Sequence, residues 1–162
     1  MDTPRSGCPI NQSVEILGDR WSLVVLRDVI FGDGRHFSAL HRDSLEGIAT
    51  NVLADRLDRL VDARLLTRHP DAAHRQRTNY RLTEAAIQLV PVLATLGAWG
   101  TAWLPVSDEL SARAEVLAEG GPELWDRFMD ELRAEHLGAA SVDHRPTVRD
   151  LLDEAYRSVH GA

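Results

Sequence analysis

Residues 34–83 read GRHFSALHRDSLEGIATNVLADRLDRLVDARLLTRHPDAAHRQRTNYRLT. Apolar side chains recur every three or four residues in the middle of this stretch, and we expect a helix there over Thr50–Ala63. Its apolar face carries Leu53, Leu57, Leu60 and Val61, and the opposite face carries Asn51, Asp55, Asp58, Arg59 and Asp62. A shorter helix over Ser38–Arg42, with Phe37 and Leu40 buried, and a turn at 44–47 are expected before it.

A β-hairpin is predicted after the longer helix. Its strands are Leu65–His69 and Asn79–Leu82, and the polar, arginine-rich segment 70–78 between them is longer than a tight turn needs. Two helices joined by a turn and followed by a basic hairpin are the order of a winged helix-turn-helix. In that arrangement the second helix enters the major groove of DNA, and the hairpin contacts the backbone or the minor groove.

Helices are also predicted before this stretch. One is expected over Pro9–Leu17, because proline suits the first helical position and Gly18 follows the end. Asp19 can cap a second helix over Arg20–Phe31, which is apolar on most sides, as in a central core helix. The glycines of Gly32-Asp33-Gly34 end it.

The segment Ala85–Ser107 contains no charged residue and is long enough to span a bilayer. Its helix-breaking residues argue instead for a helix buried against protein, often in a dimer, capped by Thr83 and ended by Pro105. The first seven residues have no apolar core of a secretory signal. We therefore expect no membrane partner.

Residues 105–162 are predicted to form three helices, divided at Gly120-Gly121-Pro122 and at 138–146. Two apolar stripes at helical spacing indicate burial. The first comprises Leu124, Trp125, Phe128, Met129 and Leu132, and the second Val148, Leu151, Leu152, Ala155, Tyr156 and Val159. We expect this part to be a stabilising extension; the alternative is a ligand pocket walled by Trp125 and Tyr156.

Charge is unevenly distributed along the 162 residues, whose net charge is −7. Residues 1–104 hold 12 arginines and 12 acidic residues, so the whole −7 comes from 105–162, with 6 arginines and 13 acidic residues. Residues 35–81 carry 9 arginines against 6 acidic residues, a balance of +3. This local basic balance is compatible with DNA binding, because phosphates respond to the nearby field.

Several motifs in the same order make Cys8–Trp103 similar to the HxlR-type winged-helix transcription regulators, relatives of the MarR group. The motifs are Cys8-Pro9, Gly18-Asp19-Arg20-Trp21, Gly34 to Leu40, Gly47-Ile48 through Leu53 to Leu60, Arg77 to Thr83, and Leu96 with Trp99-Gly100. The resemblance implies a homodimer that binds DNA, with Gly47 to Leu60 as the recognition-helix block and the uncharged segment as the dimer helix.

The chain departs from the family pattern at the recognition helix. Ala49 replaces the usual serine cap, so Thr50 is expected to cap the helix instead. Asn51 stands where a basic residue is frequent, and Asp55 and Asp58 stand where glutamine and a basic residue are common. Arg64 occupies a position that normally holds glycine and favours a positive φ. These changes affect which operator is read rather than the fold.

Cys8 is the only cysteine and lies at the start of a predicted helix, with Arg5 nearby. Both features favour the thiolate, and the family resemblance implies an oxidant- or electrophile-sensing thiol, often acting through an intersubunit disulfide. Such a bridge could join only Cys8 of two subunits, or Cys8 and a small thiol. The alternative is an unreactive thiol packed beneath the dimer helix. One cysteine also indicates a reducing, cytoplasmic setting.

Neither a metal site nor an enzyme is predicted, and no cofactor is expected. His36 and His41 are five residues apart, as are His69 and His74, which does not match the spacing of helical metal ligands. These histidines are better interpreted as phosphate-facing or solvated. None of the common catalytic or phosphate-binding motifs occurs in the sequence.

The sequence thus predicts a mainly α fold with a small β-hairpin wing. Residues 8–104 would form the DNA-binding and dimerisation domain, and 105–162 an acidic helical extension. The expected function is transcription regulation by a cytoplasmic homodimer that binds a near-palindromic operator and responds to thiol oxidation or to a small-molecule effector. The alternative is a small-molecule- or protein-binding module with vestigial DNA affinity. The predicted DNA contacts are Arg35, His36, Ser38, Thr50, Asn51, Asp55, Arg56, Arg59, Arg75, Gln76 and Arg77.

Overall fold

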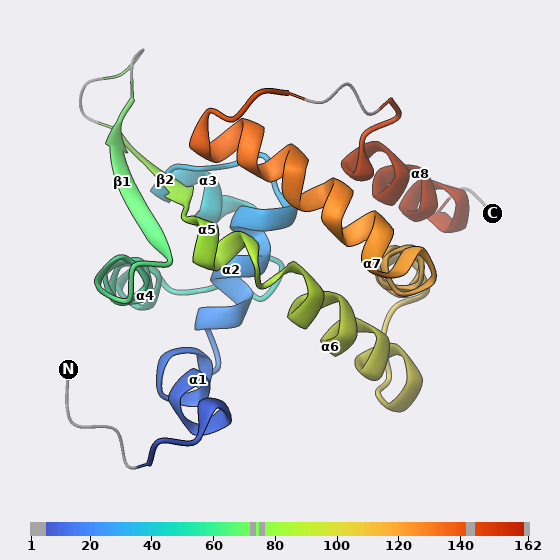
Figure 1. Ribbon diagram of the computed structural model, residues 1–162, viewed down its shortest axis with the longest axis horizontal. Helices are drawn as coiled ribbons and strands as arrows, with labels where there is room; N and C mark the ends of the chain where they lie inside the picture. The colour runs from blue at the N-terminus through green and yellow to red at the C-terminus, as the bar shows by residue number, and fades with distance from the viewer. Residues whose placement is uncertain (1–5, 72–73, 75–76, 142–144, 161–162) are drawn as a thin grey trace. The chain divides into compact units, whose positions relative to one another are not determined.

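The computed structural model describes residues 6–71, 74, 77–141 and 145–160 (Figure 1). Its internal contacts divide the chain into two compact units, Met1–Thr83 and Glu84–Ala162. Helices make up most of both units, and the first also contains a two-stranded antiparallel sheet. The predicted fold class, mainly α with a β-hairpin wing, is confirmed.

The first unit begins with four helices. They are α1 (Pro9–Leu17), α2 (Ser22–Phe31), α3 (Phe37–Arg42) and α4 (Thr50–Asp62). Asp19 precedes α2 as predicted, since its Oδ1 accepts hydrogen bonds from the amides of Trp21 (2.8 Å) and Ser22 (3.0 Å). These bonds satisfy amides that the first helical turn cannot pair.

The core of the first unit lies where α2 and α4 pack against each other and against the hairpin. Its fully buried side chains come from positions spaced three or four residues apart on the two helices, together with one residue from each strand. They are Val25, Leu26, Val29, Ile30, Leu53, Leu57, Leu60, Leu66 and Leu82. The predicted apolar face of α4 is therefore confirmed at its three leucines, while Val61 is half-buried. On α3, Phe37 was expected to be buried and is half-buried.

The hairpin consists of β1 (Leu66–Pro70) and β2 (Thr78–Leu82), paired from Leu66 with Leu82 to Pro70 with Thr78. Each strand lies within one residue of its predicted bounds. The backbone before α3 extends this pairing, because Arg35 O accepts a hydrogen bond from the Tyr80 amide (2.6 Å) and His36 pairs with Asn79. Arg64, just before β1, has φ 60°, the positive φ that was expected at this position and that strains a residue with a side chain.

The uncharged segment of the second unit is not one helix, contrary to prediction. It divides into α5 (Glu84–Ile87) and α6 (Val90–Trp103). Pro91 lies in the first turn of α6. Proline fits a first turn but disrupts a helix interior, which explains why a new helix begins here.

The acidic extension folds into α7 (Asp108–Leu137) and α8 (Val148–His160). The predicted break at Gly120-Gly121-Pro122 is confirmed as a kink in α7, at which two helical segments meet. Gly121 there has φ 56° and ψ −156°, a conformation that side chains larger than hydrogen disfavour. The described part of residues 105–162 thus contains the three predicted helical segments, two within α7 and one in α8.

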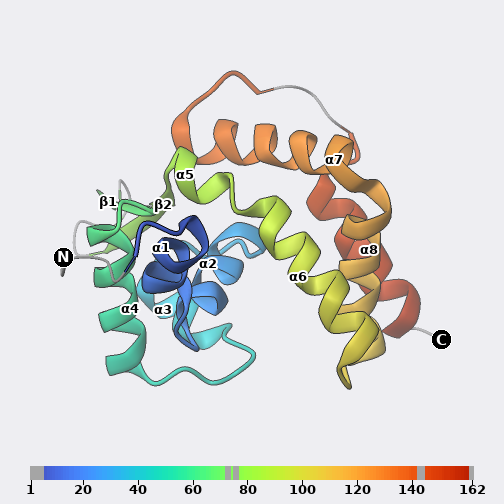
Figure 2. The same cartoon turned by 60° about the horizontal axis from the view of Figure 1, so that its bottom comes forward.

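Helix α8 packs along α7 through apolar and charged contacts (Figure 2). Phe128 and Val148 are fully buried, and the Glu131 carboxylate accepts hydrogen bonds from the Val148 amide (3.0 and 3.1 Å). Trp125 donates its indole N–H to Leu117 O (2.7 Å), and the Arg113 guanidinium lies 4.5 Å from the Tyr156 ring centre. These contacts of Trp125 and Tyr156 favour a packed extension over a pocket.

Candidate nucleic-acid interface

Helix α4 exposes one polar face, which we call the reading face. Its members are Thr50, Asn51, Ala54, Asp55, Asp58, Arg59 and Asp62. The buried leucines on the opposite side attach the helix to α2 and β1, so this face is the one that remains accessible. A helix fixed in this way can present side chains to the major groove without unfolding.

The start of α4 is fixed by the preceding turn rather than by a side-chain cap. Its N-cap is Ala49, and no side chain accepts a hydrogen bond from the first-turn amides, so the expectation that Thr50 takes over as cap is wrong. In the turn, Gly47 has φ 63°, and the Ile48 amide donates to Ser44 Oγ (3.3 Å). Ile48 is buried, which attaches this turn to the core.

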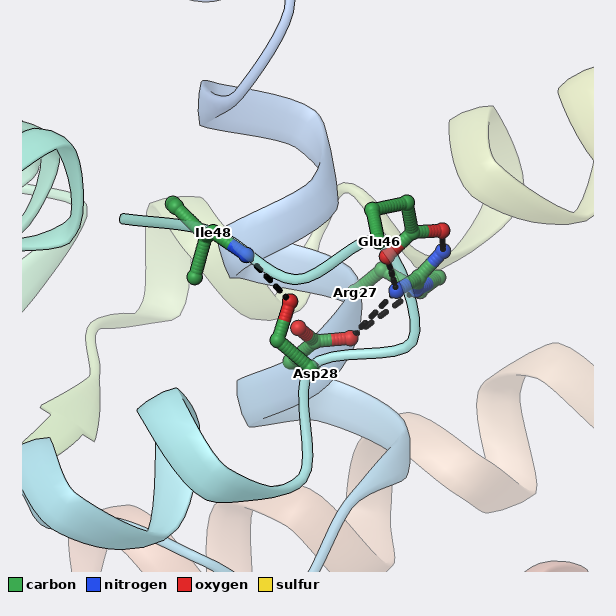
Figure 3. A network of polar contacts seen from close by, with 5 residues as sticks. Arg27, Asp28, Glu46 and Ile48 are labelled. Carbon is green, nitrogen blue, oxygen red and sulfur yellow. Dashed lines mark hydrogen bonds and ion pairs between the residues drawn. The ribbon is translucent and has the colours of Figure 1, made fainter. Parts of the chain in front are cut away.

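An arginine in the middle of α2 holds the same turn (Figure 3). The Arg27 guanidinium donates two parallel hydrogen bonds to the Glu46 carboxylate, at 2.7 and 2.8 Å, and two more to Asp28 Oδ1, at 3.0 and 2.7 Å. The bonds from Arg27 lower the pKa of Glu46. Burial, by contrast, raises the pKa of Asp28 although Arg27 opposes the shift. Such bidentate pairs are stronger than single ones, so Arg27 positions the approach to α4.

Asp19 provides a second attachment for α4. Besides capping α2, it accepts a hydrogen bond from Ser22 Oγ, and its Oδ2 lies 3.0 Å from Nη1 of Arg56 on α4. Burial raises the pKa of Asp19, but the hydrogen bonds from Ser22 and Trp21 and the charge of Arg56 together bring it below its ordinary value. Arg56 also pairs with Asp55, at 3.1 Å. Its guanidinium is therefore engaged within the protein.

The wing lies beside α4 (Figure 1). Arg68 on β1 forms an ion pair with Asp58 of the reading face, so the strand and the helix are joined by charge as well as by packing. At the hairpin loop, the Arg77 amide donates to His74 O (2.8 Å), and Arg77 O accepts from the Asp71 amide (3.0 Å). Its backbone is held while its side chain is exposed.

The predicted DNA contacts fall into three groups. Thr50, Asn51, Asp55 and Arg59 are exposed on α4, and Ser38 is exposed on α3. Arg35 and His36 are half-buried beside β2, Arg56 is half-buried on α4, and Arg77 is exposed at the loop. Arg75 and Gln76 lie outside the described residues. As DNA contacts, all of these remain predictions.

Sequence reasoning missed the ion pairs that hold α4. A signal was present for Arg27 and Asp28, two charged residues inside an otherwise apolar helix. No comparable signal marks the other two ion pairs. Arg68 and Asp58 come together only in the folded chain. The same is true of Asp19 and Arg56. From the sequence, Arg56 was therefore interpreted as a DNA contact, and its ion pairs with Asp19 and Asp55 were not foreseen.

Cys8 is exposed immediately before α1. Its amide donates to Ser6 Oγ (3.3 Å), and its carbonyl accepts from the Gln12 amide (3.0 Å). Arg5, the second part of the sensing prediction, lies outside the described residues. Exposure of the thiol fits a reactive cysteine better than a packed one, although its reactivity remains a prediction.

Among the described residues, no three histidine, cysteine or acidic side chains form a group that could hold a metal ion. The stretch Glu84–Trp103 is long and apolar enough to cross a membrane by length and composition alone. Core helices of soluble proteins pass the same test.

The arrangement from α2 to β2, with a helix-turn-helix followed by an antiparallel hairpin, defines a winged helix-turn-helix domain. The chain belongs to the HxlR-like helix-turn-helix family, whose sequence profile matches residues 16–108.

Relatives share this part of the chain. The uncharacterised HTH-type transcriptional regulator Rv3095 of Mycobacterium tuberculosis is 37% identical over 99 residues, which is 61% of each chain. A regulator of the same description from Synechocystis, sll1512, is 31% identical over 115 residues, covering 71% of this chain and 82% of that one. The chain thus spans 61% of the length of the mycobacterial relatives.

A solved structure also resembles this one. The crystal structure of PA1607, a candidate transcription factor, matches with a TM-score of 0.57 and 31% sequence identity. The match covers 64% of this chain and 70% of that chain.

Proposed function

We propose that the chain is a cytoplasmic transcription regulator that binds a near-palindromic DNA site as a homodimer. The observation that carries this proposal is the reading face of α4, on a helix that is attached through Arg56 to Asp19, preceded by a turn that Arg27 holds, and lying beside an arginine-bearing wing. Placing α4 in the major groove would bring Asn51, Asp55 and Arg59 to base edges, and would leave Arg35 and Arg77 for backbone or minor-groove contact. The family relatives, described as transcriptional regulators, support the same function.

The homodimer is supported by an apolar stripe on α6. Its members are Val92, Leu96, Trp99 and Trp103, which are 46, 47, 54 and 75% exposed in the single chain. Their spacing of four, three and four residues places them on one side of the helix, as at a helix–helix seam. Water contact with two tryptophans is unfavourable, and a second copy of the chain would remove it.

A palindromic site follows from a symmetric dimer, because each α4 would read one half of it. In this proposal residues 8–104 carry DNA binding and dimerisation, and 105–162 stabilise them. Cys8 would be the point at which an oxidant or electrophile acts, since its thiol is exposed. If so, oxidation should change DNA affinity in the wild type and not in Cys8→Ser.

The test is selection of duplexes from random DNA, followed by affinity measured against salt concentration. A regulator should enrich a near-palindromic sequence, and its affinity should fall steeply as salt rises, because phosphate contacts release counterions. Weak binding even at low salt, with no enriched sequence, would contradict the proposal. That result would favour the alternative, a small-molecule- or protein-binding module with vestigial DNA affinity.

A further inference from the structure

The reading face carries carboxylates where it would approach a polyanion. Asp55, Asp58 and Asp62 are exposed on it, and each adds a negative charge that phosphates repel. A carboxylate at this place therefore weakens binding to DNA in general. It can contribute only by making a contact that depends on the base sequence.

The structure distinguishes these carboxylates by their partners. Asp58 is paired with Arg68 of β1, so its charge is compensated from the wing. Asp62 is the last residue of α4, far from the helix start that enters the groove first. Asp55 lies between them and the N-terminus, with its side chain 58% exposed.

Asp55 is also held in place by a chain of ion pairs. Its Oδ2 lies 3.1 Å from Nη2 of Arg56, whose side chain is only 16% exposed. Arg56 Nη1 in turn lies 3.0 Å from Asp19 Oδ2, and Asp19 is fixed by the two backbone amides that start α2. The Asp55 carboxylate is thus restrained through Arg56 by a residue outside α4, and the adjacent guanidinium reduces its repulsion of phosphates.

We infer that Asp55 is a specificity-determining residue that accepts a hydrogen bond from the N4 amino group of a cytosine in each half-site. This inference rests on the proposed function. A carboxylate is only an acceptor, and cytosine presents an amino donor in the major groove. Thymine O4 and the guanine N7 and O6 atoms are acceptors and would repel it, whereas adenine pairs its amino donor with an adjacent N7 acceptor.

Arg56 acts in this account as a positioning residue for Asp55 rather than as a contact to bases. Replacing it with glutamine should weaken the preference for cytosine without removing it, because Asp55 remains but loses its restraint. Lysine, which can keep the ion pair to one of the two carboxylates, should restore part of that preference.

The experiment compares selection of random duplexes by the full-length wild type, Asp55→Asn and the matched control Asp62→Asn. Both variants remove one negative charge from an exposed position of α4, and thermal melting should show that both remain folded. The wild type should select a cytosine at one position of each half-site and discriminate against thymine there by about tenfold. Asp55→Asn should lose that preference and keep the rest of the site, whereas Asp62→Asn should keep the whole site.

Three results would overturn the inference. Specific binding by the wild type with no selected cytosine, or with a cytosine preference that survives in Asp55→Asn, overturns the role of Asp55 and leaves the proposed function standing. Failure of the wild type to bind any duplex at low salt overturns the proposed function, and the role of Asp55 with it.

Discussion

Helices α4 and α6 each leave one face uncovered in the single chain, and the two faces differ in chemistry. Apart from Ala54, the α4 face is made of carboxylates, an amide, a hydroxyl and an arginine, and ion pairs hold two of the carboxylates. The α6 face is an apolar stripe that contains two tryptophans. A hydrated, ordered polar face suits a polar partner such as DNA, whereas an apolar stripe suits another protein surface. The difference separates the proposed DNA contact from the proposed dimer contact.

The largest expected effect comes from a charge in the apolar stripe. Leu96→Asp or Trp99→Asp should give monomers or aggregates and abolish specific DNA binding, because an unpaired carboxylate in a protein interface costs several kcal/mol. Sedimentation velocity measures the outcome. Val159→Asp is the control, since Val159 is an exposed apolar residue on α8 and not part of the stripe. An intact dimer in both stripe variants would refute the assignment.

The next effect concerns the attachment of α4. Arg27→Ala should lower the free energy of unfolding by about 1–3 kcal/mol, because it leaves the part-buried Asp28 without the guanidinium that donates to its Oδ1. Arg42→Ala removes a similar arginine–aspartate pair that is exposed on both sides, and should lower the free energy of unfolding clearly less than Arg27→Ala does. Denaturant titration of both variants checks the prediction. Equal losses would mean that Arg27 contributes no more than a surface ion pair.

A smaller effect is expected at the wing. Arg77→Ala should weaken binding to all duplexes, reduce the slope of log affinity against log salt by about one unit, and leave the fold intact. Its side chain is exposed at a loop whose backbone is otherwise held. Arg157→Ala, which removes an exposed arginine from α8, should leave the slope unchanged. A wild-type slope in Arg77→Ala would remove the wing from the proposed interface.

The smallest effect is a pH dependence in the second unit. Hydrogen bonds from Arg133, and then from Gln88, lower the pKa of Glu84 to about 2. A pKa that is lower in the folded than in the unfolded state stabilises the protein at pH values above the ordinary pKa of glutamate. That stabilisation is lost as pH falls from about 4.5 towards 2. The Glu84 side chain is half exposed, so solvent screening should limit the contribution to less than about 1 kcal/mol.

Glu84→Gln measures this contribution directly. The wild type should be more stable than the variant near pH 6, and the difference should disappear near pH 2. A difference that is constant with pH would show that the bonds between Glu84 and Arg133 do not depend on the carboxylate charge.

The order of helices and strands could be predicted from the sequence because it depends on local patterns. The spacing of Leu53, Leu57 and Leu60 indicated α4, and Pro9 with Gly18 indicated both ends of α1. Arg64 was expected to adopt a positive φ, and does. Each of these features is determined by residues only a few positions apart.

The features that the sequence could not provide depend on contacts between distant residues. The ion pair between Arg68 and Asp58 requires that β1 lie beside α4, and the pair between Arg56 and Asp19 requires that α4 pack near the start of α2. The uncharged segment was expected to be buried against protein, often in a dimer, but its composition did not say which of its side chains the single chain leaves exposed. Composition indicates what kind of surface would cover a helix face. It does not say whether that surface belongs to the same chain or to another molecule.

The most direct test is hydroxyl-radical footprinting of the wild type, read by mass spectrometry, with and without its selected duplex. The account predicts that Trp99 and Trp103 are already protected in the free protein and are unchanged by DNA, because a second copy covers them. It also predicts that side chains of α4 and the hairpin become protected only when DNA is added. Rapid oxidation of both tryptophans at dimer-forming concentrations, or an unchanged pattern over residues 50–82 with DNA bound, would contradict the account.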